Sequence, residues 1–368
     1  MPDRPLRIAF YAPLKAPGHP VPSGDRQMAR MLVAALGNAG HTVRLASDLR
    51  AFRGDPEDIQ GWADLQQSAD AERLRISAEW TAGQTPDIWF CYHPYYKAPD
   101  LIGPPLAARF GLAYVTCEAS WSARRNIGIW TEMQAAVLAA VKGARLNLCM
   151  TGRDHAGLIA AAPQAPLAML PPFIDTHPFD ADPAPLAGHL VTVAMMRAGD
   201  KAQSYALLAA ALGRLPEGTP WHLSVAGDGP LCAEVHAMFA GLPPGRVTWL
   251  GQISREAVAA LLARSSIYVW PGYGEAYGLA YLEAQAAGLP VVALRVAGVP
   301  EVVSDGATGV LVAEGQAAAF ADAIHGLLQD PARAAAMGQA ARQRVRTRHS
   351  FRVAAARLDG LMRQIGGG

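Results

Sequence analysis

The chain has 368 residues, which is more than one ordinary hydrophobic core holds and enough for two domains of common size. Hydrophobic residues make up 51% and charged residues 17%, and 32 Lys and Arg against 31 Asp and Glu leave a net charge of +1. This balance gives no support for a nucleic-acid-binding surface. No apolar run of about eighteen residues or more predicts a membrane span.

Short apolar runs alternate with helical patterns along the first half of the chain. We expect a helix at 27–40, whose Met and Leu residues share one face, and an exposed polar helix at 55–80. The strands are predicted at 7–13, 42–47, 87–93, 113–118 and 146–151. Most of these runs are apolar throughout, which is typical of parallel strands covered on both faces.

The second half repeats this alternation after a proline-rich interruption at 170–189. Its strands are predicted at 190–196, 222–227, 247–251, 266–271, 290–294 and 309–312. Repeated strand–helix–strand units favour an α/β fold of two Rossmann-like, doubly wound parallel-sheet domains that face across a cleft. The predicted division is an N-terminal domain at 1–178, a linker at 179–189, a C-terminal domain at 190–349, and a last helix at 350–368 that packs back on the first domain.

The four cysteines are too widely spaced for a metal-binding motif. Cys91, Cys117 and Cys149 lie in apolar, strand-like runs, and Cys232 follows a glycine-rich turn. We expect buried, reduced thiols and, with no secretion signal at the amino terminus, a cytoplasmic protein.

The stretch "EAYGLAYLEAQAAGLPVV" places Glu275 and Glu283 eight residues apart around a predicted helix start at Tyr277–Gly278. Glu275 follows a strand, where ligand sites of α/β sheets form, and Glu283 lies one to two turns into the helix. The exposed backbone N–H groups of a helix start suit a phosphate. The arrangement therefore predicts two hydroxyl-binding carboxylates on either side of an anion site, against the alternative of two solvent-exposed glutamates.

Residues 271–312, "PGYGEAYGLAYLEAQAAGLPVVALRVAGVPEVVSDGATGVLV", resemble the donor-nucleotide signature of the family-4 retaining glycosyltransferases with the GT-B fold. The resemblance extends over nearly the whole chain through "AMMRAGDK", "LSVAGDGPL", "VTWLGQIS" and "PPFIDTHPF". It implies an enzyme that moves a hexosyl-type sugar from a UDP- or GDP-linked donor to a glycan or lipid-linked acceptor, with retention, in cell-envelope glycolipid or polysaccharide synthesis.

The resemblance also implies roles for the donor-side residues. Glu275 would hold hydroxyls of the donor sugar and act in catalysis, and Glu283 would hold the ribose. Arg197 and Lys201 would neutralise the diphosphate, although their spacing of four is one shorter than the commonest form. The remaining donor-binding candidates are Gly251 and Gln252 for the nucleobase, Tyr277, Gly278 and Leu279 at the helix start, and Gly24 in a phosphate-side loop of the first domain.

The acceptor side departs from the family pattern. Many relatives have a histidine after the strand that corresponds to "YVTCE", where this chain has Glu118. His93, at the end of another strand, is the alternative, so both are catalytic candidates and the general base is left open. Near Gly24, Ser23 and Asp25 are explained equally well as ordinary helix caps.

No metal or other cofactor is expected, because Arg197, Lys201 and the helix start supply the positive charge that the diphosphate needs. Asp180 and Asp182 match a metal-binding D-x-D pattern by chance, since they lie in the proline-rich segment. Five arginines at 342–352 indicate a solvated helix end or, alternatively, peripheral contact with the inner face of a membrane. The rival functions are a nucleotide-sugar epimerase, an inverting transferase and a non-catalytic sugar-binding protein.

Overall fold

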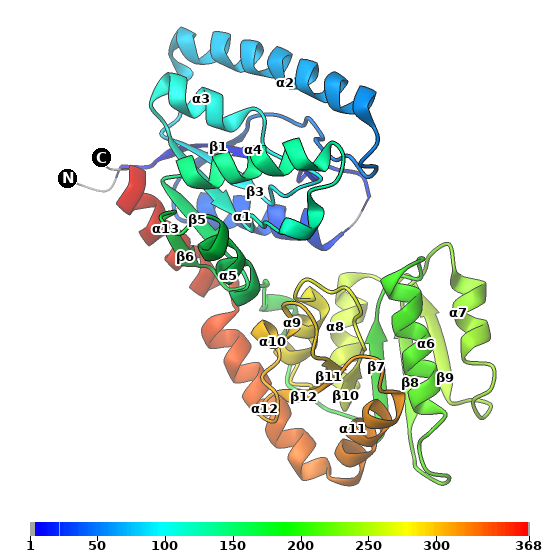
Figure 1. Ribbon diagram of the computed structural model, residues 1–368. Coiled ribbons are helices and arrows are strands. Elements are labelled where there is room, and N and C mark those ends of the chain that lie inside the picture. The colour runs from blue at the N-terminus through cyan, green and yellow to red at the C-terminus, as the bar shows by residue number, and fades with distance from the viewer. Residues whose placement is uncertain (1–3, 22, 367–368) are drawn as a thin grey trace. The chain divides into compact units, whose positions relative to one another are not determined.

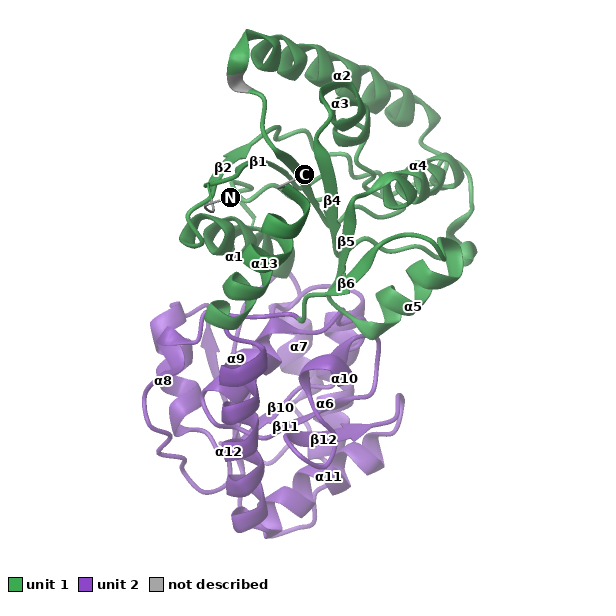
Figure 2. Cartoon of the chain, turned by 90° about the vertical axis from the view of Figure 1, so that its left-hand side faces the viewer, with its two compact units in different colours: residues 1–171, 351–368 green, residues 172–350 purple. Residues whose placement is uncertain are grey.

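The computed structural model describes residues 4–21 and 23–366, which form two compact units (Figures 1 and 2). Unit 1 comprises 1–171 with 351–368, and unit 2 comprises 172–350. The division falls between residues 171 and 172, earlier than the residue 178 predicted from the sequence, and the predicted linker 179–189 is counted in unit 2. Residues 1–3 and 367–368 of the predicted domains lie outside the described residues.

Unit 1 is built on a six-stranded parallel sheet in the order β2-β1-β3-β4-β5-β6. The strands are β1 (Arg7–Tyr11), β2 (Thr42–Leu45), β3 (Ile88–Tyr92), β4 (Ala113–Cys117), β5 (Leu146–Cys149) and β6 (Leu167–Met169). β3 is buried at all five positions, as its continuous apolar run predicts. β6 escapes the sequence prediction because it has only three residues, all half-exposed.

Helices cover both faces of this sheet (Figure 1). They are α1 (Gly24–Asn38), α2 (Ile59–Glu79), α3 (Gly103–Phe110), α4 (Trp130–Gly143), α5 (Gly152–Ala161) and α13 (Phe351–Gly366), with short helices η1 (Trp80–Gln84) and η2 (Ala123–Arg125). α1 buries the predicted face and packs beside α13, to which it is joined by a hydrogen bond of 3.4 Å from Arg363 to the carbonyl of Ala39. The opposite face of the sheet buries Trp89 against Trp80 and Leu106.

Unit 2 repeats the design with the order β12-β11-β10-β7-β8-β9. Its strands are β7 (His189–Val193), β8 (His222–Ala226), β9 (Val247–Gly251), β10 (Ile267–Val269), β11 (Val291–Leu294) and β12 (Gly309–Val312). Its helices are α6 (Asp200–Leu212), α7 (Cys232–Met238), α8 (Arg255–Arg264), α9 (Leu279–Ala286), α10 (Val299–Val302), α11 (Ala317–Gln329) and α12 (Pro331–Arg348), with η3 (His177–Phe179). This is the strand order of a dinucleotide-binding Rossmann sheet.

The chain passes between the units at two places, and the two passages are paired within unit 2. The buried His349 donates from Nδ1 to the carbonyl oxygen of Pro172 at 2.7 Å. The backbone N–H of Ile174 donates to the carbonyl of His349 at 2.9 Å, and Ile174 forms a parallel bridge with Ser350. Burial lowers the pKa of His349 to about 4, so this side chain is neutral near pH 7.

The arginine run of α12 is partly engaged by its own unit. Arg342 donates to the carbonyls of Asp180 and Ala181 at 2.8 and 2.9 Å, and it pairs with Asp182 at 3.5 Å. Arg346 pairs with Asp180 at 3.3 Å. The two aspartates of the D-x-D match therefore anchor the segment after η3 to α12, and the run is not a uniformly solvated helix end.

Two further expectations concern the cysteines and the membrane. Cys91, Cys117 and Cys149 are buried free thiols, as predicted, and Cys232 is a half-buried one. Over residues 4–21 and 23–366, no helix combines the length and the apolar character that crossing a bilayer requires.

Candidate functional site

In unit 2 most of the predicted donor residues follow β7 or β10, the two strands between which the strand order reverses. The carboxyl ends of strands at such a reversal form the usual ligand site of an open α/β sheet. Lys201, in the first turn of α6, follows β7, and Glu275 follows β10. The structure thus brings together residues that are 74 positions apart in the chain.

Lys201 and Glu275 form an ion pair beside an aromatic ring. Lys201 Nζ donates to Glu275 Oε1 and lies 5.3 Å from the centroid of the Trp270 ring. The indole Nε1 of Trp270 donates to the same carboxylate oxygen at 3.4 Å. The side chains of Lys201 and Glu275 are 19% and 20% exposed, so the pair is shielded from water yet reachable from one side. Trp270 was not predicted as a site residue, because the sequence pattern around it predicts only the end of a buried strand.

The loop that carries Glu275 is fixed by its own hydrogen bonds. The N–H of Tyr273 donates to Ser204 Oγ at 2.9 Å, and Ser204 Oγ donates to the carbonyl of Asp200 at 2.7 Å. The N–H of Glu275 closes a turn on the carbonyl of Gly272 at 3.2 Å. The loop and the start of α6 are therefore held as one rigid piece.

The predicted helix start is correct, because α9 begins at Leu279 with Gly278 as its N-cap. Gly278 has φ +76°, and a Cβ there would lie 2.5 Å from the Tyr281 ring, so both conformation and space require glycine. Gly278 has no side chain that could cap the helix, so α9 begins without a side-chain cap from its N-cap residue. Tyr277 and Leu279 are buried, which leaves their backbones as the groups that a ligand could contact. Glu283 is half-buried one turn further along α9.

Arg197 follows β7 and the predicted nucleobase loop follows β9, the two strands that flank β8 in the sheet. Arg197 is exposed just after β7. The backbone before it is held by two hydrogen bonds, from Met196 N to the carbonyl of Asp228 at 2.9 Å and from Leu231 N to the carbonyl of Met196 at 3.0 Å. Gly251 ends β9 with φ +62°, and Gln252 follows it, exposed.

In unit 1 the two acceptor-side candidates stand at the carboxyl ends of adjacent strands. His93 follows β3 and Glu118 follows β4, and their backbone N–H groups donate to the carbonyls of Cys117 and Leu148 at 2.8 Å each. Both residues adopt positive φ, +58° and +60°, and within the described chain only one other non-glycine residue does so. Such conformations cost free energy and cluster at functional positions.

His93 is paired with a residue that the sequence suggested only as a helix cap. Its Nδ1 lies 3.0 Å from Oδ1 of Asp25, in the first turn of α1. The contact spans the reversal between β1 and β3, which is the ligand-binding position of sheets with this order. Ser23 is the true N-cap of α1, since its side chain accepts from the N–H of Arg26 at 3.2 Å. Ser23 therefore caps α1, while Asp25, two residues later, is paired with His93.

The charged groups of this cluster shift one another's pKa values. Burial raises the pKa of Glu118 to about 7, against the opposing effect of the His93 charge. Burial disfavours the charged form of His93, but Glu118 and the hydrogen bond to Asp25 outweigh it and raise the pKa of His93 to about 9. Burial works against the ionised form of Asp25 as well, yet the hydrogen bond and charge of His93 lower its pKa. At pH 7, His93 is therefore an imidazolium and Glu118 is the group poised to titrate.

Asp154 completes the cluster and was missed in the sequence. It lies in the first turn of α5, is 9% exposed, and accepts from Thr151 Oγ1 at 2.6 Å. Its charge contributes to the raised pKa values of His93 and Glu118. The only sequence signal was a strand end followed by Thr-x-x-Asp, which ordinary helix capping explains equally well.

Gly24, the remaining donor candidate, belongs to unit 1 at the first position of α1. A Cβ built on it would meet no atom within 4 Å. Neither the packing nor the backbone of unit 1 therefore requires glycine here, in contrast to Gly278.

Two comparisons with solved structures identify the fold. A sucrose-phosphate synthase from Thermosynechococcus elongatus aligns over 98% of this chain and 99% of its own, with a TM-score of 0.76 at 22% identity. The Anabaena protein HepE in complex with UDP aligns over 98% and 100%, with a TM-score of 0.74 at 15% identity. The two Rossmann-like units have the GT-B fold, as predicted.

The sequence comparisons match part of the chain to a known family. Residues 187–330, within unit 2, match the family described as Glycosyl transferases group 1. Over this region the match bears out the resemblance seen in the sequence. A GDP-mannose-dependent alpha-(1-6)-phosphatidylinositol monomannoside mannosyltransferase of Mycolicibacterium smegmatis is 34% identical over 221 residues, 55% of this chain and 58% of the relative.

A second curated relative matches a shorter region. The D-inositol 3-phosphate glycosyltransferase of Mycobacterium avium is 48% identical over 97 residues, 26% of this chain and 23% of the relative. The matched regions of these two curated relatives thus span 58% and 23% of their lengths.

Proposed function

We propose that the protein is a glycosyltransferase that moves a hexosyl-type sugar from a nucleoside-diphosphate sugar to an acceptor hydroxyl with retention, in glycolipid or polysaccharide synthesis. The observation that carries the proposal is the Lys201–Glu275 pair beside the uncapped start of α9, at the strand reversal of unit 2. The relative from M. smegmatis is named for GDP-mannose, and HepE was solved with UDP. Both support a nucleotide-sugar donor.

The donor-side residues have different roles, which follow from their charge and position. Lys201, Arg197 and the N–H groups of α9 bear the diphosphate, whose negative charge grows as the glycosidic bond breaks. Glu275 holds donor-sugar hydroxyls, Glu283 holds the ribose, and the backbone at 251–252 contacts the base. The positive charge comes from the protein, so the proposal requires no metal ion.

The acceptor-side cluster orients the attacking hydroxyl. The Glu118 carboxylate accepts a hydrogen bond from it, and the His93 imidazolium, fixed by Asp25, favours the ionised form of that carboxylate. The acceptor oxygen forms the new bond to the anomeric carbon as the bond to the diphosphate breaks. The leaving diphosphate oxygen takes the acceptor proton. The acceptor thus gains the glycosyl group and the nucleoside diphosphate gains the proton.

The proposal is tested by a thermal-shift screen of UDP- and GDP-sugars, followed by product analysis. A ligand at a hundred times its dissociation constant adds about 2.7 kcal/mol of stability, which is a readily measured shift. The stabilising donor is then incubated with and without acceptors and the anomer of the product is assigned. A retained anomer that needs an acceptor supports the proposal. An inverted product would indicate an inverting transferase, an isomerised donor an epimerase, and binding without turnover on any acceptor a sugar-binding protein.

A further inference from the structure

A strip of aromatic and cationic side chains continues outward from His93 in unit 1. We call it the aromatic strip; it consists of Tyr95, Tyr96, Lys97, Arg125 and Trp130. The ring centroids of His93 and Tyr95 are 5.1 Å apart, those of Tyr95 and Tyr96 5.2 Å, and those of Tyr96 and Trp130 5.1 Å. The strip thus begins in contact with the acceptor-side cluster.

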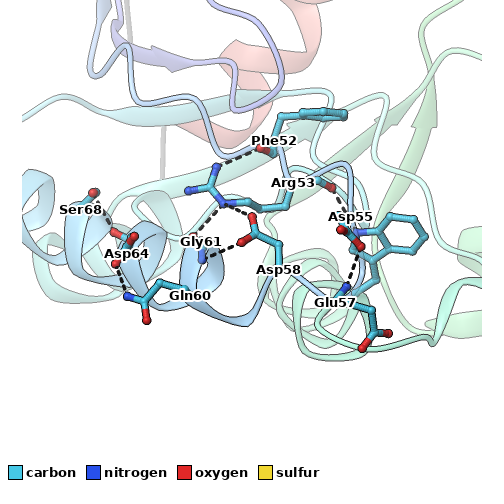
Figure 3. A network of polar contacts seen from close by, with 10 residues as sticks. Phe52, Arg53, Asp55, Glu57, Asp58, Gln60, Gly61, Asp64 and Ser68 are labelled. Atoms are coloured by element: carbon cyan, nitrogen blue, oxygen red, sulfur yellow. Dashed lines mark hydrogen bonds and ion pairs between the residues drawn. The ribbon is translucent and has the colours of Figure 1, made fainter.

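The strip is held in place by a half-buried backbone connection through Arg53. The N–H of Arg53 donates to the carbonyl of Lys97 at 2.8 Å, and the carbonyl of Arg53 accepts from Trp130 Nε1 at 3.1 Å. The Arg53 guanidinium in turn donates to the carbonyl of Gly61 at 2.8 Å and lies 3.8 Å from Asp58, the N-cap of α2 (Figure 3). One residue therefore ties both halves of the strip to the start of α2.

The cations of the strip lie on rings and lack acidic partners. Lys97 Nζ is 4.5 Å from the Trp130 centroid and 5.6 Å from that of Tyr96, and Arg125 Cζ is 5.2 Å from the Tyr96 centroid. Across 4–21 and 23–366, neither Lys97 nor Arg125 has a carboxylate within ion-pair distance. A guanidinium whose face lies on a ring keeps its in-plane N–H donors free for an anion.

The acceptor side therefore has two regions of opposite character. The inner region holds the carboxylates of Asp25, Glu118 and Asp154 around His93, which suits hydroxyl groups. The aromatic strip, which begins at the ring contact of Tyr95 with His93, offers positive charge and half-exposed ring surfaces, which suit an anion and the apolar face of a sugar.

We propose that the aromatic strip recognises a negatively charged substituent on the saccharide acceptor, carried by the sugar that presents the attacking hydroxyl or by the adjoining one. This rests on the proposed function, because it assigns the acceptor class for the same reaction. Lys97 and Arg125 hold the anion, and Tyr95 and Tyr96 support the sugar. The anion can be a free sugar phosphate or the phosphate of a lipid-linked sugar.

The test is calorimetric titration of the full chain, without nucleotide, with glucose, mannose and galactose 6-phosphates, the three parent hexoses and inorganic phosphate. At least one sugar phosphate should bind tenfold or more tightly than both its parent hexose and inorganic phosphate. Lys97→Ala/Arg125→Ala should lose that advantage, whereas Arg124→Ala, which removes a neighbouring exposed charge of η2, should keep it. If the double variant does not fold, the milder Arg125→Gln replaces it in the same titration, after its unfolding temperature has been checked.

Equal binding of sugar phosphates and hexoses, or no effect of the double variant, would overturn the proposal. If inorganic phosphate bound as tightly as every sugar phosphate, the strip would be an anion site without sugar recognition. This result would also overturn the proposal. Sedimentation with phosphatidylglycerol and phosphatidylcholine vesicles distinguishes binding to a lipid surface from binding to a sugar phosphate. The proposal is also contradicted if the protein binds anionic vesicles through Lys97 and Arg125 but binds no sugar phosphate. Because no nucleotide is present and the variants lie in unit 1, failure here is distinct from failure of the donor site in unit 2.

Discussion

At the scale of single residues, the acceptor-side cluster is a set of charges that stabilise one another at a cost in conformation. His93 and Glu118 occupy backbone conformations that other side chains avoid, and Asp25 reaches His93 from a different strand connection. A neutral residue at position 93 would leave the buried carboxylate of Glu118 and the half-buried one of Asp25 to repel each other without compensation. We therefore attribute the raised pKa of His93 to the carboxylates around it, which stabilise its cationic form.

This pairing predicts a pH-dependent contribution to stability. The pKa of His93 is raised from 6.5 to about 9 on folding, so its contribution is fully present below pH 6.5 and is lost as the pH rises through 9. Replacing His93 with Gln should lower the free energy of unfolding by on the order of 2–3 kcal/mol more at pH 6 than at pH 9.5. Urea unfolding of both proteins at the two pH values measures the difference. A gap that does not change with pH would show that His93 is not held as a cation.

At the scale of elements, the helix starts at Gly24 in unit 1 and Gly278 in unit 2 differ in their need for glycine. Gly278 is required by the fold, through its positive φ and the Tyr281 ring. Gly24 is not, because a Cβ there meets open space. For a glycine that the packing does not require, at the start of a helix beside a candidate site, we predict a role in the close approach of a ligand.

The matched substitutions to Ala should separate these two roles. Gly24→Ala should leave the unfolding temperature unchanged or raise stability by about 0.4–1 kcal/mol, while it weakens binding or turnover of the nucleotide sugar. Gly278→Ala should destabilise the protein by on the order of 1–3 kcal/mol and impair function as well. Calorimetric melting and steady-state kinetics on the two variants provide the comparison. Normal kinetics in Gly24→Ala would remove Gly24 from the site.

The elements also show how far the sequence could be interpreted. The donor-side residues 275–283 were predictable because strand, loop and helix are contiguous, so local patterns fix their positions. The Asp25–His93 contact was not, because it depends on which strands become neighbours, and no local pattern encodes that. β6 was missed for the related reason that a three-residue, half-exposed strand has no periodicity of its own.

At the scale of the whole molecule, the two passages between the units are held side by side. His349 joins Pro172 and Ile174 to the end of α12, all within unit 2, so that the chain leaves and re-enters unit 1 at one place. The histidine is fully buried and its hydrogen bond needs only the neutral ring. Its protonation would place an uncompensated charge in this junction.

The junction should therefore weaken in acid. The pKa of His349 is lowered from 6.5 to about 4, so its stabilising contribution is complete above pH 6.5 and is lost as the pH falls towards 4. His349→Gln keeps a donor for the Pro172 carbonyl and removes the titration. Its unfolding temperature should fall less than that of the wild-type protein between pH 7.5 and 4.5. Equal falls in the two proteins would contradict a role for His349 in the junction.

The central claim is that unit 2 binds the nucleotide with Glu283 and the donor sugar with Glu275, and calorimetry with UDP and GDP alone tests it most directly. These ligands lack the sugar, so Glu283→Ala should lose at least about tenfold in affinity, roughly 1.4 kcal/mol, for whichever nucleotide binds. Glu275→Ala should lose little, because removal of its carboxylate frees Lys201 for the diphosphate. Wild-type affinity in both variants, or a larger loss in Glu275→Ala than in Glu283→Ala, would contradict this assignment.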